Sequence, residues 1–538
     1  MSFEKALELK ARDTIDIDIP LKLPLFDYQK VGAAFMYSVK KCFNLDDPGL
    51  GKTSQSIGYL WLLTKAKKRR VKALVVGTSA TIYQWKDEFK KFSDFTAVIP
   101  DGSKAARVKM YDSFMTDDNT ALIINYTKIL HDFDYIRKIK FDTVIFDEAS
   151  SLKDNSSQIH KFYKWLCAPI DRVVMLTATP ISTNLDDFYN LFDIFSIEGY
   201  LPDFPTFREN FLITKDVRVK KGSRTFTVKT VVGSKNVKEF QQLLDPFYIR
   251  RENNQGVFAS LKLIPHRHAL PMTREQKQLS QKMRLDFFNK KEDERVALKL
   301  YSDFVKISCC PAIFDPNYSI VSPKAMALTE LVLSTPKKVV IFAKFIEFHK
   351  ILRAYFKKAG ISFVSITGLE SPKEKDMAKK QFWEDPDTKA ILLTGAGKFG
   401  LNLQITNRIC FADIPETPSD VFQYIGRVYR TGQEEDPQVD FFFSADSVEE
   451  DNFKTLFARQ KVIDEFFDQD KAWLFAPEDV SSIDFKESFL KKDYSKGPYF
   501  EDQPDIQKLL SLVPENFSPP AEATSQETSY YSLEDISL

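Results

Sequence analysis

The most informative stretch of the sequence for predicting the fold is DDPGLGKTSQS (46–56). It follows a short apolar run at residues 42–45 and precedes a helical pattern. Residues 51–53, Gly-Lys-Thr, match the end of the phosphate-loop pattern G-x-x-x-x-G-K-[ST], which lies between a strand and a helix. Asp46 stands where that pattern has its first glycine. The stretch therefore predicts a strand, a phosphate-binding loop and a helix, in this order.

The loop contains the residue types that phosphate binding requires. Gly49 and Gly51 let backbone N–H groups approach a phosphate, and the N-terminus of the following helix favours an anion. Lys52 is expected to reach the β- and γ-phosphates of a nucleotide, and Thr53 is expected to ligate Mg²⁺. A Gly-Lys-Thr sequence also occurs by chance, so this motif alone does not establish a nucleotide site.

Short apolar runs alternate with helical patterns in two separate blocks of the chain. The runs lie at residues 72–77, 121–125, 143–146 and 172–177 in the first block, and at 338–343, 363–366, 389–394 and 439–443 in the second. Continuous apolar runs of this length are typical of parallel strands that are buried on both faces. The alternation predicts an α/β fold with two lobes of similar size, each a parallel sheet covered by helices.

Two stretches depart from this alternation. Between about residues 186 and 330, long charged amphipathic patterns predict helical insertions. Within them, residues 216–232 alternate apolar and polar side chains, which predicts a basic β-hairpin with Lys220, Lys221 and Arg224 around its turn. After about residue 476 the periodic pattern fades, and we expect a disordered tail.

Composition excludes several classes of protein. The chain has 538 residues, of which 43% are hydrophobic and 28% are charged, as in globular proteins of roughly two to four domains. Five cysteines without paired C-x-x-C spacing argue against a disulfide framework and against a structural zinc site. The chain has no apolar run of about 18 residues and no signal-peptide core, so we expect no membrane segment. The few cysteines lead us to expect an intracellular protein in a reducing compartment.

Charge is distributed unevenly along the chain. The net charge is +1, but residues 499–538 contain eight acidic residues and one lysine. The rest of the chain therefore has a net charge of about +8, which permits a polyanionic partner without requiring one.

Two further pairs of residues are suited to nucleotide chemistry. Asp147 and Glu148 follow the predicted strand at 143–146, where one carboxylate can hold Mg²⁺ and the other can orient an attacking water. Arg427 and Arg430 lie on one face of a predicted helix and could stabilise charge on a transferred phosphoryl group. Taken separately, the acids also fit a solvated loop, and the arginines also fit an exposed helix face.

In order and spacing, these motifs resemble those of superfamily-two helicase-like motors, and among them the Swi/Snf-type ATPases. The resemblance covers about residues 25–461, and the chain looks like a compact bacterial or phage-type member. It implies a location in the cytoplasm of a bacterial or infected host cell, or in the nucleus if the cell is eukaryotic. The matching segments are LFDYQKVG (25–32), DPGLGKTSQSI (47–57), ALVVGTSATIYQWKDEF (73–89), INYTKIL (124–130), DEAS (147–150), LTATPISTNLDDFYNLFDIF (176–195), PFYIRRENN (246–254), KVVIFAKFIEF (338–348), TGAGKFGLNLQ (394–404) and QYIGRVYRTGQ (423–433). The phosphate loop of the family also lacks the first glycine, whereas Ser150 replaces the histidine of its Asp-Glu-Ala-His motif.

The resemblance implies two tandem RecA-like parallel-sheet lobes with helical insertions and a disordered acidic C-terminal tail. Lobe 1, with the ATP site, is expected at 1–265, with a helical and hairpin protrusion at about 186–260. Lobe 2 is expected at 266–475, with a helical protrusion at about 273–330 and a brace helix at about 447–470. The acidic tail is expected at 476–538.

The resemblance also implies roles for individual residues, with ATP and Mg²⁺ as cofactors. The expected catalytic residues are Lys52, Asp147, Glu148, Arg427 and Arg430. The expected ATP-binding residues are Gln29, which would read the adenine, Gly49, Gly51, Lys52, Thr53 and Gly400, and the expected Mg²⁺ ligands are Thr53 and Asp147. Coupling of hydrolysis to movement is expected from Thr177, Thr179 and Gln423, and contact with nucleic acid from Thr78, Ser79, Gln84, Tyr126, Lys128, Lys344, Thr394 and Lys398.

The function implied by the resemblance is ATP-driven translocation along duplex DNA, which remodels or displaces bound material. A strand-separating or branch-reversing helicase on forked DNA is the alternative, with the hairpin at 216–232 as a wedge. A non-catalytic scaffold that binds DNA or a partner is a third reading. It predicts loss of Lys52, Asp147 or Glu148, and all three are present. The acidic tail could bind an unknown protein partner or inhibit by mimicking DNA.

Overall fold

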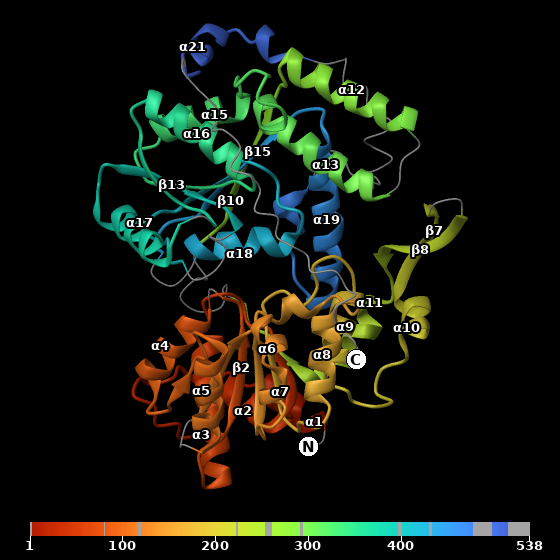
Figure 1. Cartoon of the computed structure of the whole chain (residues 1–538), viewed down its shortest axis with the longest axis vertical. Coiled ribbons are helices and arrows are strands. Elements are labelled where there is room, and N and C mark those ends of the chain that lie inside the picture. Colours follow the sequence, from red (N-terminus) through yellow and green to blue (C-terminus); the bar gives the residue numbers. More distant parts are fainter. Residues whose placement is uncertain are drawn as a thin grey trace.

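The computed structural model describes residues 3–79, 81–116, 120–221, 224–252, 261–290, 294–368, 370–395, 401–429, 433–476 and 498–514. Two parallel sheets, of seven and six strands, form the centres of two α/β lobes (Figure 1). This arrangement agrees with the α/β fold class and with the tandem RecA-like lobes that the resemblance implies. Several predictions fall outside the described residues, namely those for Lys398, Gly400 and Arg430.

The first sheet lies in lobe 1. Its order is β3 (Ala97–Val98), β4 (Ala121–Asn125), β2 (Ala73–Gly77), β5 (Thr143–Asp147), β6 (Val173–Leu176), β1 (Lys41–Asn44) and β9 (Tyr248–Ile249). Every neighbouring pair is parallel, so the carboxyl ends of all strands meet at one edge. In open parallel sheets this edge is where ligands bind.

Helices cover both faces of this sheet because successive side chains of each strand point to opposite faces. The side chains of Val75 and Ile145 pack into a cluster with α2 (Asp27–Val39), α3 (Lys52–Lys67) and α4 (Ile82–Phe92). The alternate side chains, such as Val76 and Phe146, pack with α5 (Lys104–Thr116), α8 (Gln158–Cys167) and α9 (Asp186–Asp193). Both faces of these strands are therefore apolar, which explains their continuous apolar sequences.

The second sheet lies in lobe 2 and is also parallel throughout. Its order is β10 (Ile264–Leu270), β15 (Gln438–Ser444), β14 (Arg408–Phe411), β11 (Val339–Phe342), β13 (Thr388–Leu393) and β12 (Ser362–Ile366). The helices α15 (Pro323–Ser334) and α16 (Ile346–Lys358) contribute to the core on one face, and α17 (Pro372–Glu384) and α18 (Pro418–Val428) to the core on the other.

The protrusion of lobe 1 contains the predicted hairpin. The strands β7 (Leu212–Lys221) and β8 (Arg224–Ser234) are antiparallel and lie between α10 (Phe204–Phe211) and α11 (Val237–Leu244). The hairpin projects from the body of the protein (Figure 1). The protrusion of lobe 2 contains α12 (Arg274–Lys290) and α13 (Glu294–Cys309). The remaining short elements are α1 (Phe3–Lys10), α6 (Lys128–His131), α7 (Phe133–Ile136), η1 (Ala149–Leu152), η2 (Asp245–Phe247) and α14 (Pro311–Phe314).

One helix belongs to the cores of both lobes. In α19 (Val448–Phe467), Phe453 and Leu456 pack in a core cluster of lobe 2, whereas Ile463 and Phe466 pack in a core cluster of lobe 1. Its 20 residues span about 30 Å, and Figure 1 shows the helix running from one lobe to the other. The prediction placed this helix wholly in lobe 2, because a sequence pattern shows which face is apolar but not which core the face enters.

The expected disordered tail is wrong for residues 498–514, which lie on lobe 2. They form η5 (Phe500–Asp502) and α21 (Ile506–Leu510). Phe500 is 4% exposed, and Ile506 and Leu509 pack against the same core cluster as α15 and α16. These few apolar side chains bind the segment to the lobe although its overall charge is acidic. The rest of the expected tail, residues 477–497 and 515–538, lies outside the described residues.

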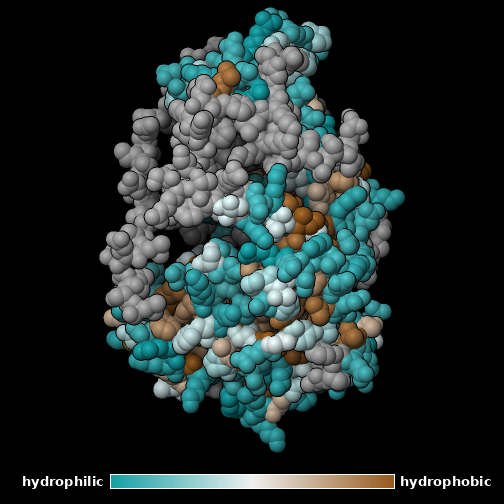
Figure 2. Space-filling model, turned by 90° about the vertical axis from the view of Figure 1, so that its right-hand side faces the viewer, coloured by the Kyte–Doolittle hydropathy of each residue, from teal (hydrophilic) through white to brown (hydrophobic). Residues whose placement is uncertain are grey.

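The surface is mostly hydrophilic on the face drawn in Figure 2. Among the described residues, no helix is both long enough and apolar enough to cross a bilayer. The five cysteines are all buried and unpaired.

A buried ion pair joins three elements of lobe 2. The ammonium of Lys324 in α15 lies 2.5 Å from Glu449 Oε1 at the start of α19, and both side chains are at most 1% exposed. The other carboxylate oxygen of Glu449 accepts a hydrogen bond from the backbone N–H of Ser444, at the end of β15, at 3.0 Å. Removing one member of such a pair leaves the other as an uncompensated buried charge.

We therefore expect Lys324→Met to lower the free energy of unfolding of lobe 2 by about 3–5 kcal/mol. Urea denaturation followed by circular dichroism measures the change. Lys508→Met is the matched control, since it removes an exposed ion pair, 3.0 Å long, with Glu330, for which we expect a loss below about 1 kcal/mol. Equal urea midpoints for the two variants would contradict this role of the buried pair.

Candidate functional site

The phosphate loop lies between β1 and α3, as predicted. Gly49 and Gly51 have φ angles of +93° and +74°, which side chains rarely allow. A Cβ atom at Gly51 would lie 2.4 Å from Gln29 Nε2, so this position also requires glycine for close packing. The ammonium of Lys52 donates hydrogen bonds to the backbone carbonyls of Asp46 at 2.6 Å and Asp47 at 3.4 Å.

The Asp46 side chain explains why the first glycine of the pattern is dispensable here. Its carboxylate is fully buried and accepts a hydrogen bond from Gln55 Nε2 at 2.8 Å. Arg251 Nε lies 3.1 Å from the other carboxylate oxygen. The loop is therefore fixed from behind by a charged side chain, where glycine would leave it without these contacts.

Gln29 lies beside the loop, at the start of α2. Its amide nitrogen donates to the carbonyl of Leu50 at 3.3 Å, and its amide oxygen accepts from the N–H of Phe26 at 3.1 Å. The residue expected to read adenine is thus brought next to the phosphate loop.

Asp147 and Glu148 stand at the carboxyl end of β5, two strands from β1 in the sheet. Trp85 Nε1 donates to Asp147 Oδ2 at 2.9 Å, and burial raises the pKa of Asp147 although this bond and the charge of Lys52 oppose the shift. Glu148 adopts a φ of +54°, a strained conformation that occurs often at functional sites. Lys52 is close enough to both acids to interact with their charges, but burial is the stronger influence and lowers the pKa of Lys52.

The residues expected to hold Mg²⁺ fit that ion. Thr53 offers a hydroxyl oxygen and Asp147 a carboxylate oxygen, which are the hard ligands that Mg²⁺ prefers. A bound cation would also stabilise the charged form of the Asp147 carboxylate, which burial disfavours. Among the described residues, no three His, Cys, Asp or Glu side chains cluster as a metal site. Mg²⁺ commonly binds through one or two protein ligands together with substrate phosphates, and Thr53 and Asp147 would fit such a site.

The three residues expected to couple hydrolysis to movement lie together. Thr177 Oγ1 accepts a hydrogen bond from the N–H of Thr179 at 3.1 Å, in the loop after β6. Gln423 in α18 of lobe 2 donates to Thr179 Oγ1 at 3.5 Å. Nearby, Ser419 Oγ donates to the carbonyl of Ile181 at 3.3 Å. The loop after β6 is therefore in direct contact with lobe 2.

The helix α18 also touches the phosphate loop. A Cβ atom at Gly426 would lie 3.3 Å from Pro48 Cβ, so a larger residue would push the helix away from the loop. Arg427 follows in this helix, beside the contact. The position of its expected partner Arg430 falls outside the described residues.

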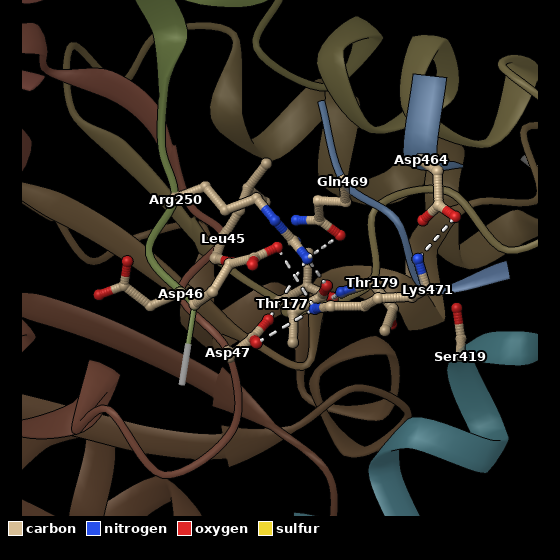
Figure 3. Close-up of polar contacts among 12 residues, drawn as sticks. Leu45, Asp46, Asp47, Thr177, Thr179, Arg250, Ser419, Asp464, Gln469 and Lys471 are labelled. Atoms are coloured by element: carbon tan, nitrogen blue, oxygen red, sulfur yellow. Dashed lines mark hydrogen bonds and ion pairs between the residues drawn. The ribbon is translucent and has the colours of Figure 1, made fainter. Parts of the chain in front are cut away.

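A cavity of about 610 Å³ lies between the lobes at this contact. Its walls include Asp47, Thr179 and Arg250 from lobe 1 and Gln423 and Lys471 from lobe 2. Figure 3 shows the side chains around Asp47.

Two cations beside Asp47 were not among the predicted site residues. Arg250 NH2 lies 3.3 Å from Asp47 Oδ1, and Lys471 Nζ lies 3.4 Å from Asp47 Oδ2. Arg250 belongs to the matching segment at 246–254, which was a usable signal. Lys471 follows α19 in a stretch without a recognisable pattern, so only the folded chain places it here.

The residues expected to contact nucleic acid have different environments. Ser79 and Gln84 are exposed near the carboxyl edge of the first sheet, and Thr78 is partly exposed. The expectation for Tyr126 needs correction, because its ring is 7% exposed and its hydroxyl donates inward to the carbonyl of Asp147 at 2.8 Å. Thr394 is 6% exposed after β13, so its side chain is also directed away from solvent.

Two of these candidates are lysines with acidic partners. Lys128 Nζ lies 3.0 Å from Asp101 and donates to the carbonyl of Pro100 at 2.8 Å. The exposed Lys344 pairs with Glu416 on the surface of lobe 2. Exposed ion pairs of this kind are weak, so both lysines can exchange an acid for another anion.

Comparisons with known proteins identify the family. Residues 28–310, more than half of the chain, match the model of the SNF2-related domain, and residues 323–432 match the helicase conserved C-terminal domain. A "Chromodomain-helicase-DNA-binding protein 1-like" of Danio rerio is 25% identical over 80% of this chain and 42% of its own length. A "Putative ATP-dependent helicase/translocase YwqA" of Bacillus subtilis is 22% identical over 83% of this chain and 49% of its own. The chain thus spans less than half the length of these relatives.

Among solved structures, the "Sulfolobus solfataricus SWI2/SNF2 ATPase core in complex with dsDNA" is similar with a TM-score of 0.40 and 22% identity. It covers 85% of this chain and 97% of that one. The TM-score is too low for residue positions to be transferred between the two. The family matches follow one another in the same order as the two lobes, and the chain therefore belongs to the SNF2-related ATPases, with an SNF2-related domain followed by a helicase C-terminal domain.

Proposed function

We propose that this protein is a DNA-stimulated ATP hydrolase that translocates on duplex DNA and remodels or displaces material bound to it. The observation that carries the proposal is the contact between the phosphate loop and α18, with Gly426 packed on Pro48. This contact brings α18 of lobe 2, which contains Arg427, to the cleft that holds Lys52. Asp147 and Glu148, at the end of β5, lie in the same cleft. Such an arrangement suits hydrolysis that depends on how the two lobes sit together.

In the proposed mechanism, the backbone N–H groups of the loop and Lys52 bind the β- and γ-phosphates. Thr53 and Asp147 would hold Mg²⁺, which would neutralise charge on the phosphates. Glu148 accepts a hydrogen bond from the attacking water and orients it toward the γ-phosphate. Arg427, in α18 of lobe 2, stabilises the negative charge that spreads over the transferred group, and the same role is proposed for Arg430 from its place in the sequence.

The Glu148 role gives a direct test. We expect Glu148→Gln to bind ATP as tightly as the wild type and to hydrolyse it at least about 10²-fold more slowly, because a neutral amide orients and polarises the attacking water less well than a carboxylate. Steady-state phosphate release and the dissociation constant of a fluorescent ATP analogue measure the two effects separately.

Asp154→Asn is the matched control for the substitution of an acid by its amide. Asp154 lies a few residues after Glu148, and its carboxylate accepts local hydrogen bonds from Ser156. Its substitution should leave turnover unchanged. Turnover of Glu148→Gln near the wild-type rate would remove Glu148 from the catalytic role.

Duplex DNA is the proposed track. The phosphates of the DNA backbone offer contacts that do not depend on base sequence, which suits a motor that moves along DNA. The exposed candidates Ser79, Gln84 and Lys344 and the partly exposed Lys128 follow strands of the two parallel sheets, so they can line a common groove. The names of the relatives from Danio rerio and Bacillus subtilis, which include DNA binding and translocation, support this choice of track.

The hairpin β7–β8 favours strand separation as a second candidate function. It projects from lobe 1 (Figure 1), and residues 212–235 include seven basic residues and one acidic residue. A projecting basic ribbon can split a fork or can hold the backbone of an intact duplex.

Replacing Lys220, Lys221 and Arg224 by serine distinguishes these two uses. If the hairpin is a wedge, the variant should lose unwinding of a forked duplex while blunt duplex still stimulates its ATP hydrolysis. If the hairpin only grips the backbone, stimulation by blunt duplex should weaken as well, and more steeply with salt. Unchanged unwinding and unchanged stimulation would exclude both roles.

A further inference from the structure

The segment that follows α19 returns from lobe 1 to lobe 2 and passes the phosphate loop on its way. It turns at Asp468, which has a φ of +55° and pairs with Lys238 of lobe 1. It then enters η4 (Ala472–Phe475), whose residues Leu474 and Phe475 are buried in the core of lobe 2. Both ends of the short stretch 468–475 are thus anchored, one on each lobe.

Asp464 holds this segment in one shape. Its Oδ2 accepts hydrogen bonds from the backbone N–H groups of Lys471 at 2.8 Å and Ala472 at 2.7 Å. Its Oδ1 accepts from Gln460 Nε2 at 2.7 Å. The backbone at Lys471 is therefore fixed to the end of α19.

The Lys471 ammonium lies between two acids of lobe 1. It is 3.4 Å from Asp47 Oδ2 in the phosphate loop and 3.4 Å from Glu252 Oε1 just after β9, as Figure 3 shows for Asp47. The side chains of Lys471 and Asp47 are 26% and 14% exposed, so solvent screens this pair less than a surface pair.

Asp47 connects this ammonium to Lys52. The carboxylate of Asp47 contacts Lys471 and Arg250. Its backbone carbonyl accepts a hydrogen bond from Lys52 Nζ at 3.4 Å. A displacement of the Asp47 side chain can therefore move Lys52, because both contacts belong to one residue.

Arg250 links the same carboxylate to the rest of lobe 1 and to α19. It donates to the carbonyls of Leu45 at 3.3 Å and Ala178 at 3.1 Å, and its guanidinium lies 4.3 Å from the centre of the Phe467 ring. It also contacts Gln469 Oε1 at 3.4 Å. One carboxylate, Asp47, is thus held by Arg250 of lobe 1 and by Lys471 of the stretch that joins α19 to η4.

We propose that Lys471 is a positioning residue for ATP turnover, which fixes the phosphate loop through Asp47. This inference rests on the proposed ATP hydrolysis. Lys471 lies between the end of α19, which packs in lobe 1, and η4, which packs in lobe 2. Its contact with Asp47 keeps the loop, and with it Lys52, in the productive place. The residue acts on the transition state more than on the binding of ATP.

The test compares Lys471→Gln, Lys471→Arg and the control Lys461→Gln in the full chain. Lys461 is exposed in α19, with its ammonium over the Phe457 ring. We expect Lys471→Gln to lower kcat about tenfold with the KM for ATP within about twofold, Lys471→Arg to recover most of the rate, and Lys461→Gln to match the wild type. A kcat of Lys471→Gln within about twofold of wild type, or an arginine variant as slow as the glutamine variant, would overturn the proposal.

A double-mutant cycle with Asp47→Asn tests the route. If Lys471 acts through Asp47, Lys471→Gln should add little to the effect of Asp47→Asn. Effects that multiply would show that Lys471 acts elsewhere and would overturn the proposal.

A wild type that does not hydrolyse ATP would refute the proposed function, but it would not test the contact between Lys471 and Asp47. The same cycle, measured on the free energy of unfolding, tests that contact: non-additive effects support it, and additive effects overturn the proposal.

Discussion

The carboxylate of Asp47 is the contact that joins the phosphate loop to the segment between the two lobes. Arg250 approaches it from lobe 1 and Lys471 from the stretch between α19 and η4, at 3.3 and 3.4 Å. The same residue presents its backbone carbonyl to Lys52. An acid in the phosphate loop therefore connects Lys52 to the segment that is anchored on both lobes.

Parallel strands explain how the other parts reach this place. In each sheet every strand ends at the same edge, so the phosphate loop, the Asp147–Glu148 pair and the Thr177–Thr179 loop meet although they are far apart in sequence. The helix α19 then connects the two edges, because one half of it is buried in each core. The lobes are thus linked through apolar packing at the helix and through charges at the loop.

The sequence was sufficient for the parts of the fold that depend on local pattern. Apolar runs predicted β2, β4, β5, β6, β11, β12, β13 and β15, and alternation predicted the hairpin. The sequence pattern did not predict β9, which has only two residues. It also did not predict β14, a four-residue strand that begins with Arg408, which pairs with the buried Asp440. Contacts that depend on the assembled chain were also missed, namely Lys471 on Asp47, the inward hydroxyl of Tyr126, and the docking of Phe500.

We expect the binding of ATP to change the relative position of the two lobes. Energy transfer between dyes on the two lobes measures this change. Cysteines introduced at Lys68 and Met377, both exposed, can be labelled selectively because the five native cysteines are buried. In the Glu148→Gln background, ATP should change the transfer efficiency, and the added substitution Lys52→Ala should abolish the change. An efficiency that stays constant while ATP is demonstrably bound would contradict the account.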